Sequence, residues 1–275
     1  MMWMDEKHIM KKIGTFPFGQ PVQEVVQADH TPKNVFVLGV YASAVHARWI
    51  SVREKTVVNA LAVASEPYIF WRGDDTEEII QQIAIPKELG RLVPAKQEFN
   101  GPSGIALDDL ILNPLGLERK QAWLCDLVPH SCVNPSQRRA IEREYIPIAK
   151  EYNLAQHTVP SVPTQLTNEI RREEILDELI VSGARVLILL GDKPIQWFLS
   201  SFTDRWKRLS DFGRDGQSYG QLHYAQIAGK EMKVLPLAHP RQIAKLGQSS
   251  ADWYECHETW RKGSAGKIAL SIKTD

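Results

Sequence analysis

Residues 34–40 read Asn-Val-Phe-Val-Leu-Gly-Val, a short and nearly unbroken apolar run around a glycine. A run of this kind is typical of a central β-strand that is covered on both faces. Three further runs, at residues 122–128, 185–191 and 232–237, have the same character. Together they predict an α/β fold built on a central four-stranded parallel sheet.

The segments between these runs predict the layers that cover the sheet. Residues 105–112 and 167–180 carry apolar side chains at spacings of three and four, as crossover helices do. We therefore expect three layers, with helices flanking the sheet. The run Arg171-Arg172-Glu173-Glu174 mixes both signs of charge and is interpreted as a solvated helix face.

Other segments set the expected domain limits. Residues 1–33 lack a firm period and include a stretch rich in Pro, Gly and Gln, which predicts an extended N-terminal segment on the surface. Residues 34–275 are expected to form a single domain. Residues 56–71 favour a hairpin or an edge insertion, because they are rich in Val and aromatics and break at Ser65-Glu66-Pro67.

Composition restricts the classes of partner. The 275 residues include 33 basic and 33 acidic side chains, so no overall positive field would attract nucleic acid and any DNA footprint must be local. The charged stretch 1–12 does not resemble a secretory signal, and no apolar stretch is long enough to span a bilayer. The three cysteines suit a reducing compartment. We expect a cytoplasmic monomer with no membrane partner.

Polar residues follow several of the predicted strands. The first of these polar residues at each strand end are Tyr41, Asp126, Asp192 and His239. Ligands of open parallel α/β sheets bind outside the carboxyl ends of the strands, so these side chains are expected to converge on one rim. The sequence therefore predicts a binding site there before any family is considered.

Five segments at or near this rim resemble motifs of the uracil-DNA glycosylase superfamily, especially its thermostable branch, whose members often carry an iron–sulfur cluster. They are residues 39–43, 99–104, 125–128, 189–191 and 239–240. The resemblance covers most of the chain after Asn34. It implies a DNA base-excision enzyme that hydrolyses the N-glycosidic bond of a flipped, damaged or deaminated base. The implied partner is DNA, damaged or single-stranded, or a free nucleobase or nucleotide.

The resemblance also assigns roles to residues. It implies that Phe99 stacks on the base and that Gly101 lets the backbone approach it; the alternatives are a core Phe and a flexible turn. His239 would donate to the base oxygen where negative charge gathers, or would be a turn residue. Ser43, Arg241 and Gln242 are expected to contact DNA. Arg241 and Gln242 replace the small residues that are usual after His-Pro, and Arg241 would either meet a phosphate or take the role of the groove-penetrating loop.

The first motif departs from the family. Val40 and Tyr41 occupy the two places where a carboxylate or an Asn would position water, so Val40 is assigned to the base wall and Tyr41 to catalysis. His46 is the substitute base, although a His on an apolar helix face is more often packed.

Asp126 stands where the family commonly has an Asn that reads a pyrimidine edge. An ionised Asp only accepts hydrogen bonds, so it would favour a base with amino or imino hydrogens unless burial lets the carboxyl donate as well. The alternative is a carboxylate that caps the following turn.

No cofactor and no metal are expected. Cys125, His130 and Cys132 lack a fourth ligand, and the four-cysteine pattern of the cluster-bearing branch is missing. The second functional hypothesis is a non-catalytic nucleobase- or nucleic-acid-binding protein that kept the fold and lost hydrolysis.

Overall fold

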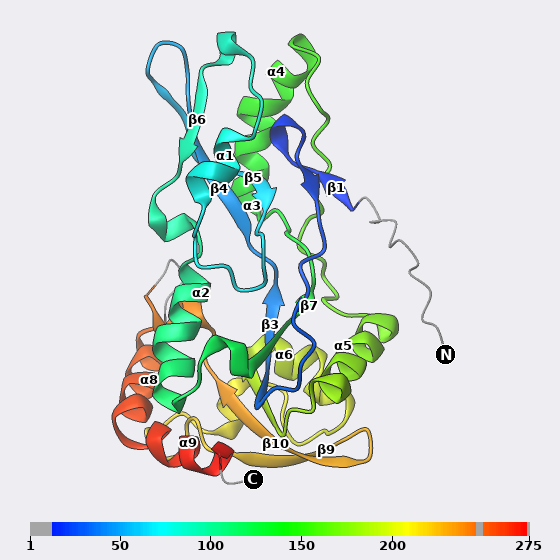
Figure 1. Ribbon diagram of the computed structural model, residues 1–275, viewed down its shortest axis with the longest axis vertical. Helices are drawn as coiled ribbons and strands as arrows, with labels where there is room; N and C mark the ends of the chain where they lie inside the picture. The colour runs from blue at the N-terminus through cyan, green and yellow to red at the C-terminus, as the bar shows by residue number, and fades with distance from the viewer. Residues whose placement is uncertain (1–12, 246–249, 274–275) are drawn as a thin grey trace.

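A computed structural model describes residues 13–245 and 250–273 and contains a mixed α/β fold (Figure 1). Its main sheet has five strands in the order β7-β3-β8-β10-β9. Their bounds are β3 (Val35–Tyr41), β7 (Ala122–Val128), β8 (Val186–Leu190), β9 (His223–Ile227) and β10 (Lys230–Leu237). The first four in this order run parallel, and β9 pairs antiparallel with β10.

The expectation of an all-parallel, four-stranded sheet is therefore corrected to a mostly parallel, five-stranded one. Each of the four predicted strands forms close to its expected place. The fifth strand was missed because its exposed face breaks the apolar run. It reaches β10 through a tight turn at Ala228 and Gly229, which both have positive φ, at 48° and 78°.

Helices lie on both sides of this sheet (Figure 1). Helices α5 (Glu169–Ser182) and α6 (Asp192–Trp197) contact β7, β3 and β8. Helix α2 (Pro102–Leu107) continues as a π-helical turn and packs against α7 (Pro240–Ile243), which contacts α8 (Ala251–Gly263). Helix α9 (Ala265–Lys273) follows α8 and contacts it. Both helices predicted at 105–112 and 167–180 form.

A second, three-stranded antiparallel sheet has the order β5-β4-β6. Its bounds are β4 (Ala44–Ile50), β5 (Thr56–Ser65) and β6 (Arg91–Pro94), and it is accompanied by α1 (Thr76–Gln81), α3 (Pro135–Ala140) and α4 (Ile146–Glu151). These elements form the small lobe, with its own hydrophobic cluster, and the five-stranded sheet with its helices forms the main lobe (Figure 1).

Two expectations change in the small lobe. Residues 44–50, expected to begin a helix, form β4, because apolar and β-branched residues fill its buried positions on both faces. Residues 14–15 and 21–22 form β1 (Gly14–Thr15) and β2 (Pro21–Val22). Phe16 is fully buried in the small-lobe cluster, so this segment is part of the core and is not a surface arm. The stretch 1–12 lies outside the described residues.

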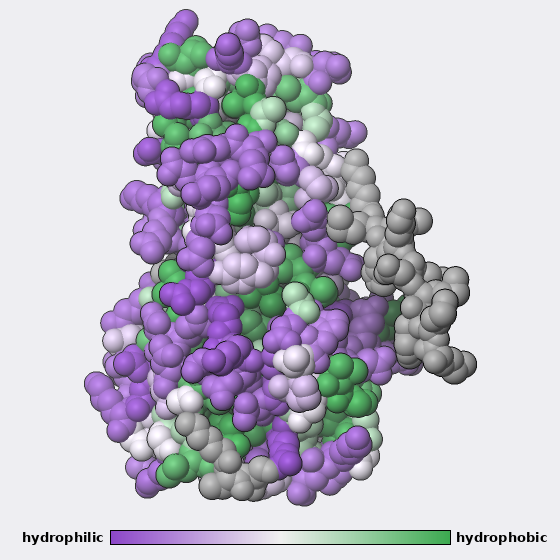
Figure 2. All heavy atoms as spheres, viewed as in Figure 1, coloured by the Kyte–Doolittle hydropathy of each residue, from purple (hydrophilic) through white to green (hydrophobic). Residues whose placement is uncertain are grey.

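Figure 2 shows mostly hydrophilic side chains on both lobes, with apolar atoms visible where the lobes meet. None of the helices within the described ranges has the length and apolar character that a bilayer crossing requires.

Candidate functional site

A hollow of about 800 Å³ lies at the carboxyl ends of the parallel strands, where the small lobe meets the main lobe. Eight residues singled out from the sequence line it: Val40, Tyr41, Ser43, Gly101, Asp126, His239, Arg241 and Gln242. Strand ends that are up to about 200 positions apart thus meet on one rim. The other two, Phe99 and His46, do not line it.

Asp126 lies near the end of β7 and is 3% exposed. It pairs in register with Gly39 of β3, and a Cβ built on Gly39 would overlap Asp126 Oδ1 and lie 2.6 Å from Phe70 Cζ. The missing side chain at Gly39 therefore leaves room for the carboxyl. Burial raises the pKa of Asp126 to about 7, against the opposing effects of Arg171 and the Val40 backbone N–H.

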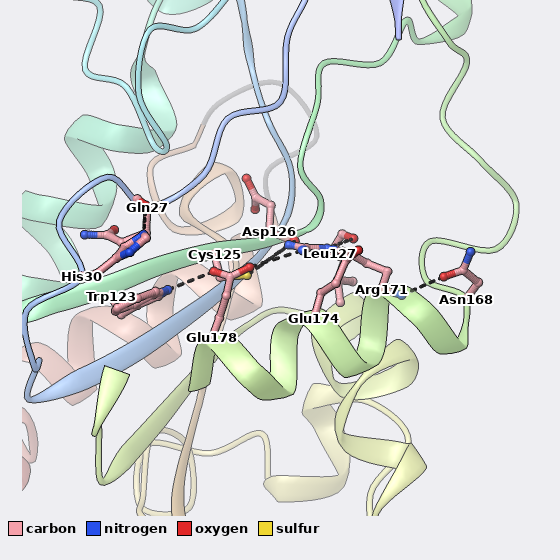
Figure 3. A network of polar contacts seen from close by, with 10 residues as sticks. All are labelled: Gln27, His30, Trp123, Cys125, Asp126, Leu127, Asn168, Arg171, Glu174 and Glu178. Carbon is pink, nitrogen blue, oxygen red and sulfur yellow. Dashed lines mark hydrogen bonds and ion pairs between the residues drawn. The ribbon is translucent and has the colours of Figure 1, made fainter. Parts of the chain in front are cut away.

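Arg171 of α5 holds the strand that carries Asp126 (Figure 3). Its Nη2 donates to the Asp126 carbonyl oxygen at 2.8 Å, and its Nε donates to the Leu127 carbonyl oxygen at 3.3 Å. Nη1 forms ion pairs with Glu174 at 3.1 Å and Glu178 at 3.3 Å. The Asp126 carboxyl points away from this network. The interpretation of residues 171–174 as only a solvated face was therefore wrong for Arg171.

His239 is the N-cap residue of α7, and its ring has a defined tautomer. Nδ1 accepts from the Arg241 backbone N–H at 3.2 Å, so in the neutral ring the proton is on Nε2. Burial, followed by the charge of Arg241, lowers the pKa of His239 to about 4. The ring is therefore neutral at physiological pH, and its Nε2–H has no acceptor among the described residues.

Gln242 has a structural partner inside the protein. Its Oε1 accepts from the His239 backbone N–H at 3.1 Å, which closes a capping box. The side chain predicted to contact DNA therefore holds His239 in place.

A buried relay supports the strand end before His239. The Ala238 N–H donates to the Tyr219 hydroxyl at 2.9 Å, which is 2.9 Å from His257 Nδ1. His257 Nε2 lies 2.8 Å from the Leu110 carbonyl oxygen and must donate to it, so Nδ1 accepts from Tyr219. Burial lowers the pKa of His257 to about 4, which keeps this arrangement neutral.

Glu66 is the site residue that the sequence did not reveal. It follows β5, is 3% exposed and enters the hollow from the small lobe. Its Oε2 accepts from the Trp71 N–H at 3.3 Å, whereas its Oε1 has no hydrogen-bond partner among the described residues. Burial, followed by the charge of Asp126, raises the pKa of Glu66 to about 8. In the sequence, the signal that could have identified Glu66 is its position as a single acidic residue between two apolar runs.

The aromatic wall comes from Phe70 and Trp71, not from Phe99. Phe99 is 37% exposed, and its ring centroid is 6.4 Å from that of His46. Phe70 adopts a φ of 52°, which is unusual for an aromatic residue. Arg119 holds it by donating to the carbonyl oxygens of Phe70 at 2.9 Å and Ile69 at 3.2 Å.

His46 and Gly101 have structural explanations. His46 lies on β4, its backbone N–H donates to Asn100 Oδ1 at 2.8 Å, and burial lowers its pKa to about 4. Gly101 has a φ of 72°, and a Cβ there would overlap the backbone of Arg72. The glycine permits close packing of two backbone segments, in addition to its place in the hollow wall.

Tyr41 and three cations complete the rim. Burial raises the pKa of Tyr41, so its hydroxyl stays protonated at neutral pH. Arg139, Lys193 and Arg241 line the hollow and are exposed. These three charges come from α3, α6 and α7 and give a nearly neutral chain a local basic edge.

Within the described ranges, no group of three or more His, Cys, Asp or Glu side chains is arranged to hold a metal ion. Comparison of the sequence with models of known families and with curated proteins found no match.

Proposed function

We propose that this protein is a base-excision glycosylase, similar in its three-layer plan to the uracil-DNA glycosylases, that hydrolyses the N-glycosidic bond of a flipped base. One observation carries the proposal. A neutral His239 with a free Nε2–H and a buried Asp126 face the same hollow at the carboxyl ends of parallel strands.

The chemistry needs a donor at the leaving base. Water adds to the anomeric carbon, the bond from that carbon to the base nitrogen breaks, and the base leaves with the electron pair. The proton that the attacking water loses ends on the released base. The Nε2–H of His239 donates to the base oxygen on which the negative charge gathers. A neutral donor held by the α7 cap needs no reorganisation during the reaction.

The remaining rim residues have roles that match their positions. Phe70 takes the stacking role first assigned to Phe99, because its ring lines the hollow. Arg139, Lys193 and Arg241 meet the phosphates on either side of the flipped nucleotide. Tyr41 donates from the end of β3, and Val40 and Ser43 form the wall beside it.

The test is base release from single- and double-stranded oligonucleotides that carry uracil, hypoxanthine, xanthine or an alkylated base. Wild type is expected to give strand scission after alkali with at least one of them. His239→Ala should lose about 10²–10³-fold in rate, as expected for one lost oxyanion donor. His30→Ala is the matched control, because His30 is exposed and outside the hollow. Equal rates for His239→Ala and wild type would refute the role of His239.

A second candidate is a nucleobase-binding protein without hydrolysis. It is favoured by the end of β3, where Val40 and Tyr41 offer no carboxylate to activate water. If no oligonucleotide releases a base, while free bases or abasic DNA raise the melting temperature, this candidate replaces the first.

A further inference from the structure

Two buried carboxyls from different lobes face the same hollow. Asp126 comes from β7 of the main lobe, and Glu66 follows β5 of the small lobe. Each is 3% exposed. Carboxylates are rarely buried without a cation or several donors, so the pair requires a physical explanation.

The two cations that lower the pKa values of the pair, Arg119 for Glu66 and Arg171 for Asp126, are engaged by other groups. Arg119 pairs with Asp108 at 3.0 Å and donates to backbone oxygens. Arg171 pairs with Glu174 and Glu178 on the side of the sheet away from the Asp126 carboxyl. Within the described ranges, no ion pair is formed by either Glu66 or Asp126. The two carboxyls are thus buried at one site without an ion-pair partner among the described residues.

Two buried acids at one site share protons, because the second ionisation meets both desolvation and the first charge. Burial and Asp126 raise the pKa of Glu66 to about 8, and burial raises that of Asp126 to about 7. The other charged or titratable groups that act on the pair or share its hollow are Tyr41, Arg119, Cys125, Arg139, Arg171, Glu178, Asp192, Lys193, His239 and Arg241.

One oxygen of the pair has an unmade hydrogen bond. Glu66 Oε2 accepts from the Trp71 N–H, but Oε1 is buried in the hollow wall without a partner. An unsatisfied buried polar atom destabilises the protein, and a ligand in the hollow that bonds to it would remove that penalty. A protonated Oε1 donates, whereas the Asp126 carboxylate accepts.

We propose that Glu66 and Asp126 form one recognition edge, with Glu66 donating and Asp126 accepting, that selects neutral bases with a hydrogen-bond donor next to an acceptor. Uracil and hypoxanthine carry such an edge as N–H beside C=O. The pair thereby offers one donor and one acceptor to the base, as a single Asn amide would. This inference rests on the proposed function only in taking a base as the ligand and does not require hydrolysis.

The test is calorimetric binding of uracil and hypoxanthine as free deoxynucleosides, beside 3-methyldeoxyuridine and 1-methyldeoxyinosine, between pH 6.5 and 9. Wild-type affinity should fall by about tenfold per pH unit above the ionisation of Glu66, because only the protonated form donates. Glu66→Gln should remove this loss, since its amide NH2 donates in the place of the protonated Oε1 and its carbonyl oxygen accepts from the Trp71 N–H. The methylated bases, which lack the N–H, should bind at least about tenfold more weakly.

The control is Glu98→Gln, the same change on an exposed side chain outside this hollow. Because wild type and Glu66→Gln are measured on the same ligands, ionisation of the base itself cancels in their ratio. Thermal unfolding of each variant shows that it is folded.

Three results would overturn the inference: equal pH dependence in wild type and Glu66→Gln, equal binding of the methylated bases, or no binding of any of the deoxynucleosides. The expected pH dependence without base release from oligonucleotides would support the recognition edge while refuting hydrolysis. Base release that is unchanged in Glu66→Gln at every pH would support hydrolysis while refuting the recognition edge.

Discussion

At the scale of single residues, the hollow depends on one missing side chain. Gly39 of β3 lies beside Asp126 in the sheet, and any Cβ there would meet both the Asp126 carboxyl and the Phe70 ring. The glycine in the apolar run at 34–40 therefore makes space for the site as well as for the strand.

Gly39→Ala should destabilise the protein by about 1–3 kcal/mol, as overpacking does, and should weaken base binding by displacing Asp126 or Phe70. Denaturant unfolding and calorimetric binding measure the two effects. Gly263→Ala is the control, because no heavy atom lies within 4 Å of a Cβ built at the end of α8. Gly263→Ala is expected to be neutral or slightly stabilising. A Gly39→Ala variant as stable as wild type would contradict the close packing.

Glu66 should also make stability depend on pH. Its pKa is raised from 4.5 to about 8, so between these values the folded protein binds the proton and the unfolded chain does not. The contribution of Glu66 to the free energy of unfolding is therefore highest below pH 4.5 and is lost as pH rises toward 8. Glu66→Gln should gain stability relative to wild type over that interval. Urea unfolding at pH 5, 6.5 and 8 measures it, and a constant difference would refute the raised pKa.

At the scale of elements, two supports behind the rim hold its strands. One is the Arg171 network, which ties α5 to the end of β7. The other is the relay through Tyr219 and His257, which ties the end of β10 to α8 and to the helical turn at Leu110. Both act on backbone, so they position Asp126 and His239 without touching a ligand.

Arg171→Met should cost about 3–5 kcal/mol, because it leaves the partly buried Glu178 without its ion pair and strand oxygens without a donor. Chemical denaturation measures the loss. Arg172→Met should change stability by less than about 0.5 kcal/mol, because no ion pair of Arg172 is found in the described parts of the chain. Similar losses in the two variants would argue against the network.

Tyr219→Phe should cost about 1–3 kcal/mol, because it leaves the buried Ala238 N–H and His257 Nδ1 without partners. As a positioning residue, Tyr219 should affect the rate of base release more than the affinity for free base. Tyr224→Phe is the matched control, since Tyr224 is exposed. A rate unchanged in Tyr219→Phe would refute the positioning role.

At the scale of the whole molecule, the site is a junction between two lobes with separate hydrophobic clusters. The main lobe supplies Asp126 and His239, and the small lobe supplies Glu66 and Arg139. The formal net charge is zero, so electrostatic attraction in the proposed binding of DNA depends on the basic edge.

Binding of a single-stranded oligonucleotide should therefore depend only modestly on salt. Three phosphate contacts predict a slope of about −2 to −3 for log K against log salt concentration. Arg139→Ala, Lys193→Ala and Arg241→Ala should each reduce this slope by about 1. Fluorescence anisotropy across a salt series measures it. A slope unaffected by all three variants would place the DNA elsewhere.

The sequence alone determined the four apolar strands and the order of polar residues that follow them. Parallel strands bring their carboxyl ends to one edge, so the meeting of Tyr41, Asp126 and His239 follows from local pattern and a general rule of topology. Only the tertiary structure decided what closes the hollow. Glu66 and Phe70 replace His46 and Phe99 there, because local periodicity specifies a residue's element and face, while the contact between two lobes depends on packing across the whole chain.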